Sequence, residues 1–560
     1  MNFKENKKTE VMRDKLPIFL MIVLSVMAFI HVEAQEDESW FYFRARDTVF
    51  NPSFEQRGDF LVYMGSDVTL KQVLEKYNIK MFKKTWRNAK KENLKKTFFV
   101  IADDDGLMED LLGKTSHLFE FGELIDEEDK KIFEPNDYGL TSTIGDNIGA
   151  QVNLDYYDFL DVPKAWYYTT GSRDIIIGIS DGEIDTLDIE FAGKTKVVRP
   201  SHHVDGHGYS VAATAAAQGD NGYGIPGICY DCSIYNTDYK HSRTLDQLME
   251  LSRMGVKVIN CSWGISRKYE TAQEAIYEML ENGTVVVAIG HNKPFSEGKG
   301  EVYYYPASYD KVIAVSSASH RYADYHENIK VEMPKNLYYV ENIRYYVGRT
   351  AGFKDNDTTN LPYLYPISIK NLNDKIDIVA PSVGIFRYSE LALRNTIDMS
   401  IYNQTSGVAP LVTGTVGLMF SLYPCLPADE VESIIKLTST NIDDIEANKP
   451  YRGLYGAGML NTGRAVKMVF DMFAEREPVV VENQRFSRWD FKLTSHSDVV
   501  IQHQEFTEAA VLDLTSKSGI TVGENTVLKP GRNGGIHLKI DPALEKECDL
   551  VLRDPSILDK

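Results

Sequence analysis

Residues 174–182 read DIIIGISDG, a run of apolar and mostly β-branched residues that ends at a carboxylate. A run of this kind, bounded by turn residues, predicts a buried strand. Comparable apolar runs occur further along the chain, at 256–262, 285–289, 312–315 and 376–379. Residues 211–217 and 271–280, which lie between them, have the composition of helices. Apolar strands that alternate with helices predict an α/β fold, in which helices cover both faces of a parallel sheet.

Three side chains suited to acyl transfer lie next to these elements. Asp181 follows the first strand, His207 precedes the helix at 211–217, and Ser406 precedes a second apolar helix. A serine that attacks a peptide bond needs an imidazole to take its proton and a carboxylate to orient that imidazole. Side chains at the carboxyl ends of parallel strands converge at one edge of the sheet. Each residue alone is common as a cap or turn residue, but together they predict a serine hydrolase.

The segments around these residues resemble the motifs of the subtilisin-like serine proteases (subtilases, peptidase family S8) of the secreted bacterial type. ISDGEID at 179–185 is similar to the aspartate motif, and HGYSVAAT at 207–214 is similar to the histidine motif. QTSGVAPLVTG at 404–414 resembles the serine motif, and YGAGMLN at 455–461 resembles the closing motif. The order Asp, His, Ser is that of subtilisin. The matches span about 150–470.

The resemblance implies a subtilisin-like fold and a serine endopeptidase with the triad Asp181, His207 and Ser406, which acts on protein or peptide substrates through an acyl-enzyme. This chemistry requires no cofactor. Structural calcium sites are common in the family, but no calcium ligands can be assigned here. The loop pattern His202, His203, Asp205 and His207 lacks the distant ligands that would complete a metal site, so we interpret it as loop residues beside the catalytic histidine.

The resemblance also places the substrate-binding surface. One side is the edge segment on which family members bind substrate as an added strand, and it corresponds to Ser262, Trp263 and Gly264. The opposite wall of the primary pocket corresponds to Ala288, Ile289 and Gly290. A medium-sized apolar substrate side chain fits this expectation.

The donor to the tetrahedral oxygen has two candidates. The family places an Asn after an Ala-Gly pair, and this chain has Gly290 followed by His291 and Asn292. Without a gap, His291 takes the donor position; with a bulge of one residue, Asn292 does. An imidazole can donate only in the correct tautomer, which favours Asn292 but leaves both in place.

Several positions depart from the family pattern, among them Glu183, Tyr209, Gln404, Gly407 and Val408. Glycines often stand where only glycine leaves room for the backbone or the substrate. An alternative hypothesis is therefore a catalytically silent binding or adhesion protein on the same fold, and a Gln404 side chain that fills the cleft would favour it. A metal-dependent hydrolase is a third hypothesis.

The N-terminal segment predicts export. Basic residues precede an apolar run from Leu16 to Ile30, and small residues at 32 and 34 suit a signal peptidase. We therefore predict a signal peptide over 1–34 and a protein that is secreted, periplasmic or held at the cell surface. No later stretch is expected to span a membrane.

Residues 36–135 are predicted to form an α+β domain with the ferredoxin-like order β-α-β-β-α-β, whose first strand lies at 60–64. Family resemblance implies a propeptide-like prodomain that inhibits its own enzyme; a permanent accessory domain is the alternative. Residues 126–150 suit a linker. The catalytic domain is expected over 136–475, with an insertion at about 320–375. Residues 478–560 predict a small all-β domain without a strong repeat.

The formal net charge of −20 argues against a nucleic-acid partner, because phosphate binding needs a basic surface. Five cysteines accompany the predicted export. Cys229 and Cys232 are candidates for a small disulfide loop. Cys261 is expected to be a buried thiol, and Cys425 and Cys548 have no recognisable partner.

Overall fold

The computed structural model describes residues 38–85, 91–145, 148–203, 206–295, 301–323, 325–329, 340–387 and 400–558. The chain divides into two compact units between Lys130 and Lys131. Each unit has its own hydrophobic core. The predicted signal peptide at 1–34 lies outside the described residues.

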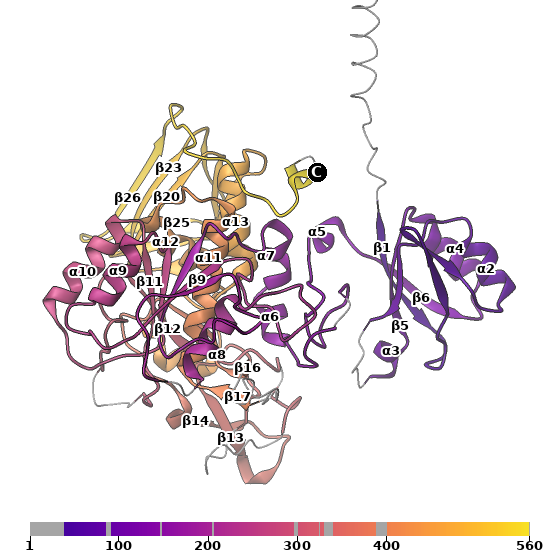
Figure 1. Cartoon of the computed structure of the whole chain (residues 1–560), viewed down its shortest axis with the longest axis horizontal. Helices are drawn as coiled ribbons and strands as arrows, with labels where there is room; N and C mark the ends of the chain where they lie inside the picture. Colours follow the sequence, from indigo (N-terminus) through magenta and orange to yellow (C-terminus); the bar gives the residue numbers. More distant parts are fainter. Residues whose placement is uncertain are drawn as a thin grey trace, which may run out of the picture. The chain divides into compact units, whose positions relative to one another are not determined.

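A seven-stranded sheet with the order β15-β12-β11-β10-β7-β9-β8 forms the centre of the second unit (Figure 1). Its strands are β7 (Ile176–Ser180), β8 (Thr195–Val197), β9 (Ser233–Thr237), β10 (Val258–Cys261), β11 (Val285–Ile289), β12 (Val312–Ala318) and β15 (Ile378–Pro381). All six neighbouring pairs are parallel. A parallel sheet of this kind must be covered on both faces, which explains why its strands are apolar along their whole length.

Helices cover both faces, and the predicted α/β fold is confirmed. Successive strand residues face opposite ways, so Val258 belongs to one core cluster and Ile259 to the other. Helices α8 (His207–Ala216) and α11 (Val408–Leu422) pack into the first cluster. Helices α9 (Asp246–Arg253) and α10 (Glu270–Glu281) pack into the second. The remaining helices of the unit are α6 (Asp155–Phe159), α7 (Val162–Tyr168), α12 (Ala428–Leu437) and α13 (Thr462–Ala474).

Helix α11 is the central element of the first layer. It touches β7, β10, β11, β12 and β15, and every one of its residues is buried. By length and composition, Thr405–Leu422 could cross a membrane, contrary to the expectation that no stretch after the signal peptide would do so. This segment is buried entirely inside the unit, as expected for a core helix that is apolar all round.

The predicted insertion lies between β12 and β15. It contains the antiparallel pair β13 (Arg349–Phe353) and β14 (Pro362–Tyr365). An ion pair holds the start of the insertion, since Arg321 Nε lies 2.6 Å from Asp155 Oδ2 in α6. After β15, β16 (Val383–Arg387) and β17 (Ser400–Asn403) form a second antiparallel pair that leads to Ser406.

The N-terminal unit contains a four-stranded antiparallel sheet with the order β4-β5-β1-β6 (Figure 1). Its strands are β1 (Ser39–Ala45), β4 (Met81–Lys84), β5 (Thr97–Ala102) and β6 (Phe119–Leu124). Helices α2 (Val68–Leu74) and α4 (Gly106–Lys114) pack together over one face, and α3 (Glu92–Lys95) and α5 (Glu127–Lys130) are single turns.

One predicted strand of this unit was assigned wrongly. The first strand of the sheet is β1, whose Phe41, Phe43 and Ala45 are fully buried. The segment predicted as the first strand, 60–64, is β3 (Phe60–Tyr63). It pairs with β2 (Phe54–Arg57) in a hairpin outside the four-stranded sheet. Aromatic residues at successive positions conceal the alternation of β1, because the residues on its other face are also large.

The segment predicted as a linker, 126–150, also differs. From 133 onward it packs into the second unit, where the Tyr138 hydroxyl donates to Asp158 Oδ1 at 2.8 Å and the Ala150 N–H donates to the Gly224 carbonyl at 2.7 Å. Tyr138 is fully buried. The polar composition therefore reflects a loop that packs on the second unit and not a flexible tether.

The C-terminal residues form three parallel coils, a repeat that the sequence analysis missed. Three three-stranded parallel sheets make the sides: β18 (Val479–Glu482), β21 (Val499–Gln502) and β24 (Ile520–Val522); β19 (Arg485–Phe486), β22 (Glu505–Glu508) and β25 (Val527–Pro530); and β20 (Asp490–Ser495), β23 (Val511–Ser516) and β26 (Gly535–Ile540). Equivalent residues are 20 to 24 positions apart, as Val479 with Val499 and Val511 with Gly535. Such coils need only apolar inward side chains, so their residues differ from coil to coil.

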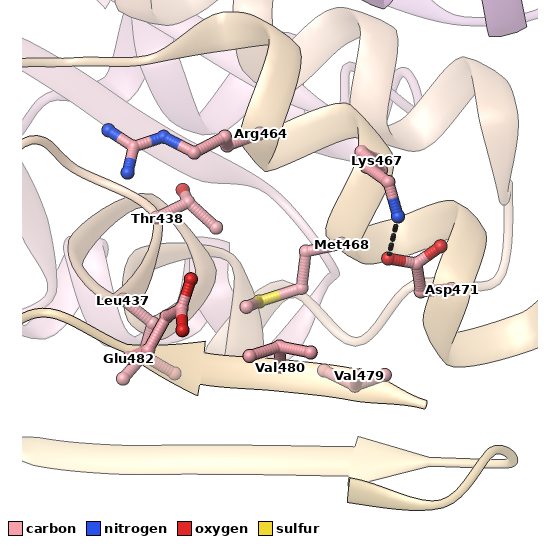
Figure 2. Close-up of a pocket in the computed structure, with 9 residues that line it drawn as sticks. All are labelled: Leu437, Thr438, Arg464, Lys467, Met468, Asp471, Val479, Val480 and Glu482. Atoms are coloured by element: carbon pink, nitrogen blue, oxygen red, sulfur yellow. Dashed lines mark hydrogen bonds and ion pairs between the residues drawn. The ribbon is translucent and has the colours of Figure 1, made fainter. Parts of the chain in front are cut away.

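These coils are not a separate domain. Phe486, Phe491 and Phe506 belong to the same core cluster as α11 and the large sheet. The Lys492 N–H donates to Ser433 Oγ in α12 at 3.0 Å. A hollow of about 210 Å³ lies between α13 and β18. Figure 2 shows its lining, which contains the Lys467–Asp471 ion pair, the polar residues Arg464, Thr438 and Glu482, and apolar side chains.

A disulfide between Cys425 and Cys548 ties the C-terminal tail to the end of α11. The tail continues along the catalytic unit, where the Val551 N–H donates to the Leu422 carbonyl at 2.8 Å. No partner for these two cysteines could be recognised in the sequence, because 123 positions separate them and the coils bring them together only in the folded chain. A second disulfide joins Cys229 and Cys232.

Removing the Cys425–Cys548 bond in a Cys425→Ser/Cys548→Ser variant should lower the free energy of unfolding by about 2–4 kcal/mol, because the bond closes a long loop and restricts the unfolded chain. Chemical denaturation of both proteins measures this. A reductant should destabilise the natural chain but change the variant much less; equal stability of the two oxidised proteins would contradict the prediction.

Candidate active site

The carboxylate and the imidazole predicted from the sequence lie together at one edge of the large sheet. Asp181 follows β7, and His207 begins α8 after Gly206, whose φ of 75° suits glycine. The distance from His207 Nδ1 to Asp181 Oδ1 is 2.7 Å. Since a carboxylate can only accept, this bond requires the proton on Nδ1 and leaves Nε2 as the basic nitrogen. Asp181 Oδ1 also accepts the Gly182 N–H at 2.6 Å, which holds the carboxylate in place.

Ser406 lies in the single turn η4 (Thr405–Gly407) that leads into α11. Helix α8 packs against this turn, so the elements that carry His207 and Ser406 are neighbours. The Ser406 carbonyl accepts Ser262 Oγ at 3.0 Å, which fixes the turn to the end of β10. The start of an apolar helix offers free N–H groups and a positive dipole end beside the serine.

Of the two candidate donors, Asn292 contacts the turn that carries Ser406. Asn292 Oδ1 accepts both the N–H and the hydroxyl of Thr405, at 2.7 and 2.8 Å. An amide that uses its oxygen in this way presents its two N–H bonds on the other side. The position before it, His291, has a φ of 99°, a left-handed backbone that favours glycine.

The His291 ring is occupied elsewhere. It stacks on Tyr304 with a centroid distance of 3.8 Å and an interplanar angle of 9°. Its Nδ1 accepts the Lys293 N–H at 3.1 Å. Burial, with a smaller effect of the Lys293 charge, lowers the pKa of His291, so the ring is neutral at neutral pH.

The end of the insertion braces this loop. Asn371 Nδ2 donates to the carbonyls of Gly290 and Val302, at 2.8 and 2.9 Å, and the Asn371 N–H donates to the His291 carbonyl at 3.4 Å. Asn371 is buried. The loop at 290–292 is therefore held by Asn371 of the insertion as well as by Thr405.

The predicted substrate-binding residues divide into two groups. On the first wall, Trp263 Nε1 donates to Ser180 Oγ at 3.1 Å, and Gly264 lies opposite Tyr304 and His291. On the second wall, the side chains of Ala288 and Ile289 point into the two core clusters. A Cβ at Gly290 would lie 2.6 Å from Ile376 Cδ1, so this position also faces the core. Because these side chains face the core, only the main chain of residues 288–290 could line the predicted pocket.

The departures from the family pattern do not remove any of the predicted groups. Gln404 is exposed and has an extended backbone with a φ of −139°, which any residue can adopt. Glu183 is also exposed. Tyr209 is buried against Phe191, with ring centroids 4.9 Å apart. These residues fill surface or core positions outside the Asp181–His207 contact.

The described residues contain no group of three or more His, Cys, Asp or Glu side chains placed to hold a metal ion. Within the loop pattern at 202–207, His203 stacks on Tyr239 with centroids 5.0 Å apart and His207 contacts Asp181. Asp205 lies outside the described residues. Burial raises the pKa of the Cys261 thiol, so it is a poor nucleophile.

Sequence analysis did not identify Thr405, Asn371 or Tyr304 as part of the site. Thr405 adjoins Ser406 and could have been found as its neighbour. Asn371 is far from Gly290 in the chain, and the return of the insertion to the end of β11 brings it there. Tyr304 is placed beside His291 by the antiparallel bridge between Ile265 and Tyr305.

Residues 172–458 match the model of the subtilase family (peptidase S8). Subtilisin DY of Bacillus licheniformis is 26% identical over 52% of this chain and 90% of its own length. The calcium-dependent protease of Trichormus variabilis is 23% identical over 63% of this chain and 53% of its own length. Among solved structures, the prenylagaramide maturation protease PagA is 20% identical, with a TM-score of 0.40 over 55% of this chain and 98% of that protein.

Asn371→Ala should release the loop at 290–293, because the buried Gly290 carbonyl loses its side-chain donor at a cost of about 1–3 kcal/mol. Hydrogen–deuterium exchange should show faster exchange of the His291 to Lys293 amides. Asn373→Ala is the matched control: it removes a bond of 2.9 Å to the same Val302 carbonyl and leaves Gly290 bonded. Faster exchange in Asn373→Ala alone, or in neither variant, would contradict the prediction that Asn371 holds this loop.

Proposed function

The chain belongs to the subtilase family of serine-type endopeptidases, and we propose that Asp181, His207 and Ser406 form its catalytic triad. The observation that carries the proposal is the 2.7 Å contact between His207 and Asp181, made from the helix that packs against the Ser406 turn. The carboxylate orients the imidazole and stabilises the imidazolium that forms during the reaction.

The reaction proceeds through an acyl-enzyme. Ser406 Oγ attacks the carbonyl carbon of the scissile bond while its proton moves to Nε2 of His207. The tetrahedral intermediate then collapses, the C–N bond breaks, and His207 gives the proton to the leaving amine. Water repeats the sequence on the ester, with His207 again as base, and releases the acid and free Ser406.

Asn292 is the side-chain donor to the developing oxyanion. Its oxygen is held by Thr405, so its N–H bonds are directed away from Thr405 before substrate arrives. Donors placed in advance stabilise the transition state without reorganisation. His291, whose Nδ1 accepts from Lys293 and whose ring packs on Tyr304, is the weaker candidate.

A peptide substrate pairs as an added strand along Ser262, Trp263 and Gly264. The main chain of this segment continues β10, and Ile265 and Tyr305 already exchange two bonds of 2.8 Å just beyond it. Ser262 connects this binding strand directly to the Ser406 turn through the 3.0 Å bond.

The N-terminal unit is an intramolecular inhibitor that accompanies the enzyme during export. It has a core of its own, and its boundary with the catalytic unit falls at Lys130. The signal-like segment at 1–34 supports release from the cytoplasm, and two disulfides are consistent with an oxidising compartment.

A fluorophosphonate probe should label the catalytic unit after the N-terminal unit has been removed, and Ser406→Ala should abolish labelling. His207→Ala should reduce it strongly, because the hydroxyl then lacks its base. Ser556→Ala, which changes a half-buried serine near the C-terminus, serves as the control and should be labelled normally.

Absence of labelling in folded protein freed of its N-terminal unit would overturn the active triad. The catalytically silent binding protein would then be the better account. Labelling that persists in Ser406→Ala would assign the nucleophile to another residue.

Asn292→Ala should lower kcat about 10²–10³-fold with little change in KM, since the donor acts mainly in the transition state. This magnitude is the one known for subtilisin, a member of the same family, and does not come from the present structure. Steady-state kinetics on a peptide substrate measures it.

Asn292→Asp is the matched variant, because it keeps the acceptor for Thr405 and removes the donor. It should lose activity as Asn292→Ala does. If both variants retain normal kcat while His291→Gly loses it, His291 is the donor.

A further inference from the structure

The stacked pair of His291 and Tyr304 lies beside the surface where substrate binds. A Cβ atom added to Gly264 would be 3.7 Å from His291 Cδ2 and 3.6 Å from Tyr304 Cβ. Both distances are ordinary contacts for a bonded carbon. Since a carbon–carbon bond is about 1.5 Å long, the Gly264 Cα and His291 Cδ2 are at most about 5.2 Å apart.

That separation is too small for a substrate side chain. A carbon atom placed between two others needs about 3.5–4.0 Å on each side, or roughly 7 Å in total. A side chain that extends past its own Cβ therefore cannot enter between Gly264 and the His291 ring.

We propose that the His291–Tyr304 stack closes the primary specificity pocket, so that the residue on the acyl side of the scissile bond must be Gly, Ala or Ser. This inference rests on the proposed function, in which Gly264 lies along the bound peptide. It is narrower than the medium-sized apolar residue expected from the sequence.

The stack is held firmly enough to act as a wall. Tyr304 is 4% exposed and is followed by Tyr305, whose main chain is bonded to Ile265. The left-handed backbone of His291 is fixed on one side by Asn371 and on the other by the 2.8 Å bond from the Gly290 N–H to the Val315 carbonyl. The ring itself accepts the Lys293 N–H and stacks on Tyr304, and it cannot swing aside without breaking both contacts.

The half-buried position of the His291 ring supports the same assignment. Its pKa is lowered, so it presents a neutral face to Tyr304 and adds apolar surface where a large substrate side chain would otherwise lie. Lys293 Nζ lies 5.7 Å from the centroid of the Tyr304 ring and adds a further contact to the pair.

The test is a set of quenched peptides that differ only at the residue before the scissile bond, with Gly, Ala, Ser, Leu or Phe, assayed with the full chain after its own activation. The natural protein should cleave the Ala peptide with a kcat/KM at least about 30-fold above that of the Phe peptide. His291→Gly suits the positive φ and removes the ring; it should lower this ratio at least about tenfold.

Tyr304→Ala should also lower the ratio of the Ala to the Phe peptide. This second variant leaves residue 291 unchanged, so it tests the stack even if His291→Gly folds poorly or displaces Asn292. Tyr303→Phe is the matched control, because its hydroxyl contacts only Glu301 and Asp374 at the surface, each at 3.0 Å. The control should keep the natural ratio.

Efficient cleavage of the Phe or Leu peptide by the natural protein would overturn the inference and leave the proposed function intact. An unchanged ratio in both stack variants, with cleavage retained, would overturn it as well. If the natural protein cleaves no peptide and takes no fluorophosphonate, the proposed function fails and the inference fails with it.

Discussion

The close approach of helices α8 and α11 is the constraint on which the rest of the structure depends. A Cβ on Gly414 would lie 2.5 Å from Ile228 Cβ and 2.8 Å from the Ala215 carbonyl, so α11 can pack here only because this position has no side chain. His207 begins α8, and Ser406 immediately precedes α11. The packing of α8 against α11 therefore sets the separation of His207 and Ser406.

A second constraint acts on the loop after β11. His291 has a left-handed backbone, and the next residue, Asn292, accepts from Thr405. The His291 ring stacks on Tyr304. Asn371 holds the main chain of this loop from the insertion. The same few main-chain bonds therefore hold both the proposed oxyanion donor and the stack proposed to close the pocket.

The C-terminal coils contribute to the catalytic unit and not to a module of their own. Their inward aromatic side chains extend the core beneath α12, and the Cys425–Cys548 bond returns the tail to the end of α11. The helix that follows Ser406 is therefore covered at its far end by residues more than a hundred positions away. This arrangement limits motion of α11 without any contact to substrate.

The sequence by itself predicted the parallel sheet and its helices and supplied the proposed triad of Asp181, His207 and Ser406, because apolar runs and short motifs are local properties of the chain. It left the choice between His291 and Asn292 open, since the contact of Asn292 with Thr405 depends on the backbone angles that neighbouring segments impose. It missed the Cys425–Cys548 pair and the parallel coils, whose partners are distant and whose residues need only be apolar. Only the tertiary structure could decide these features, because each requires contacts between segments that the chain brings together after folding.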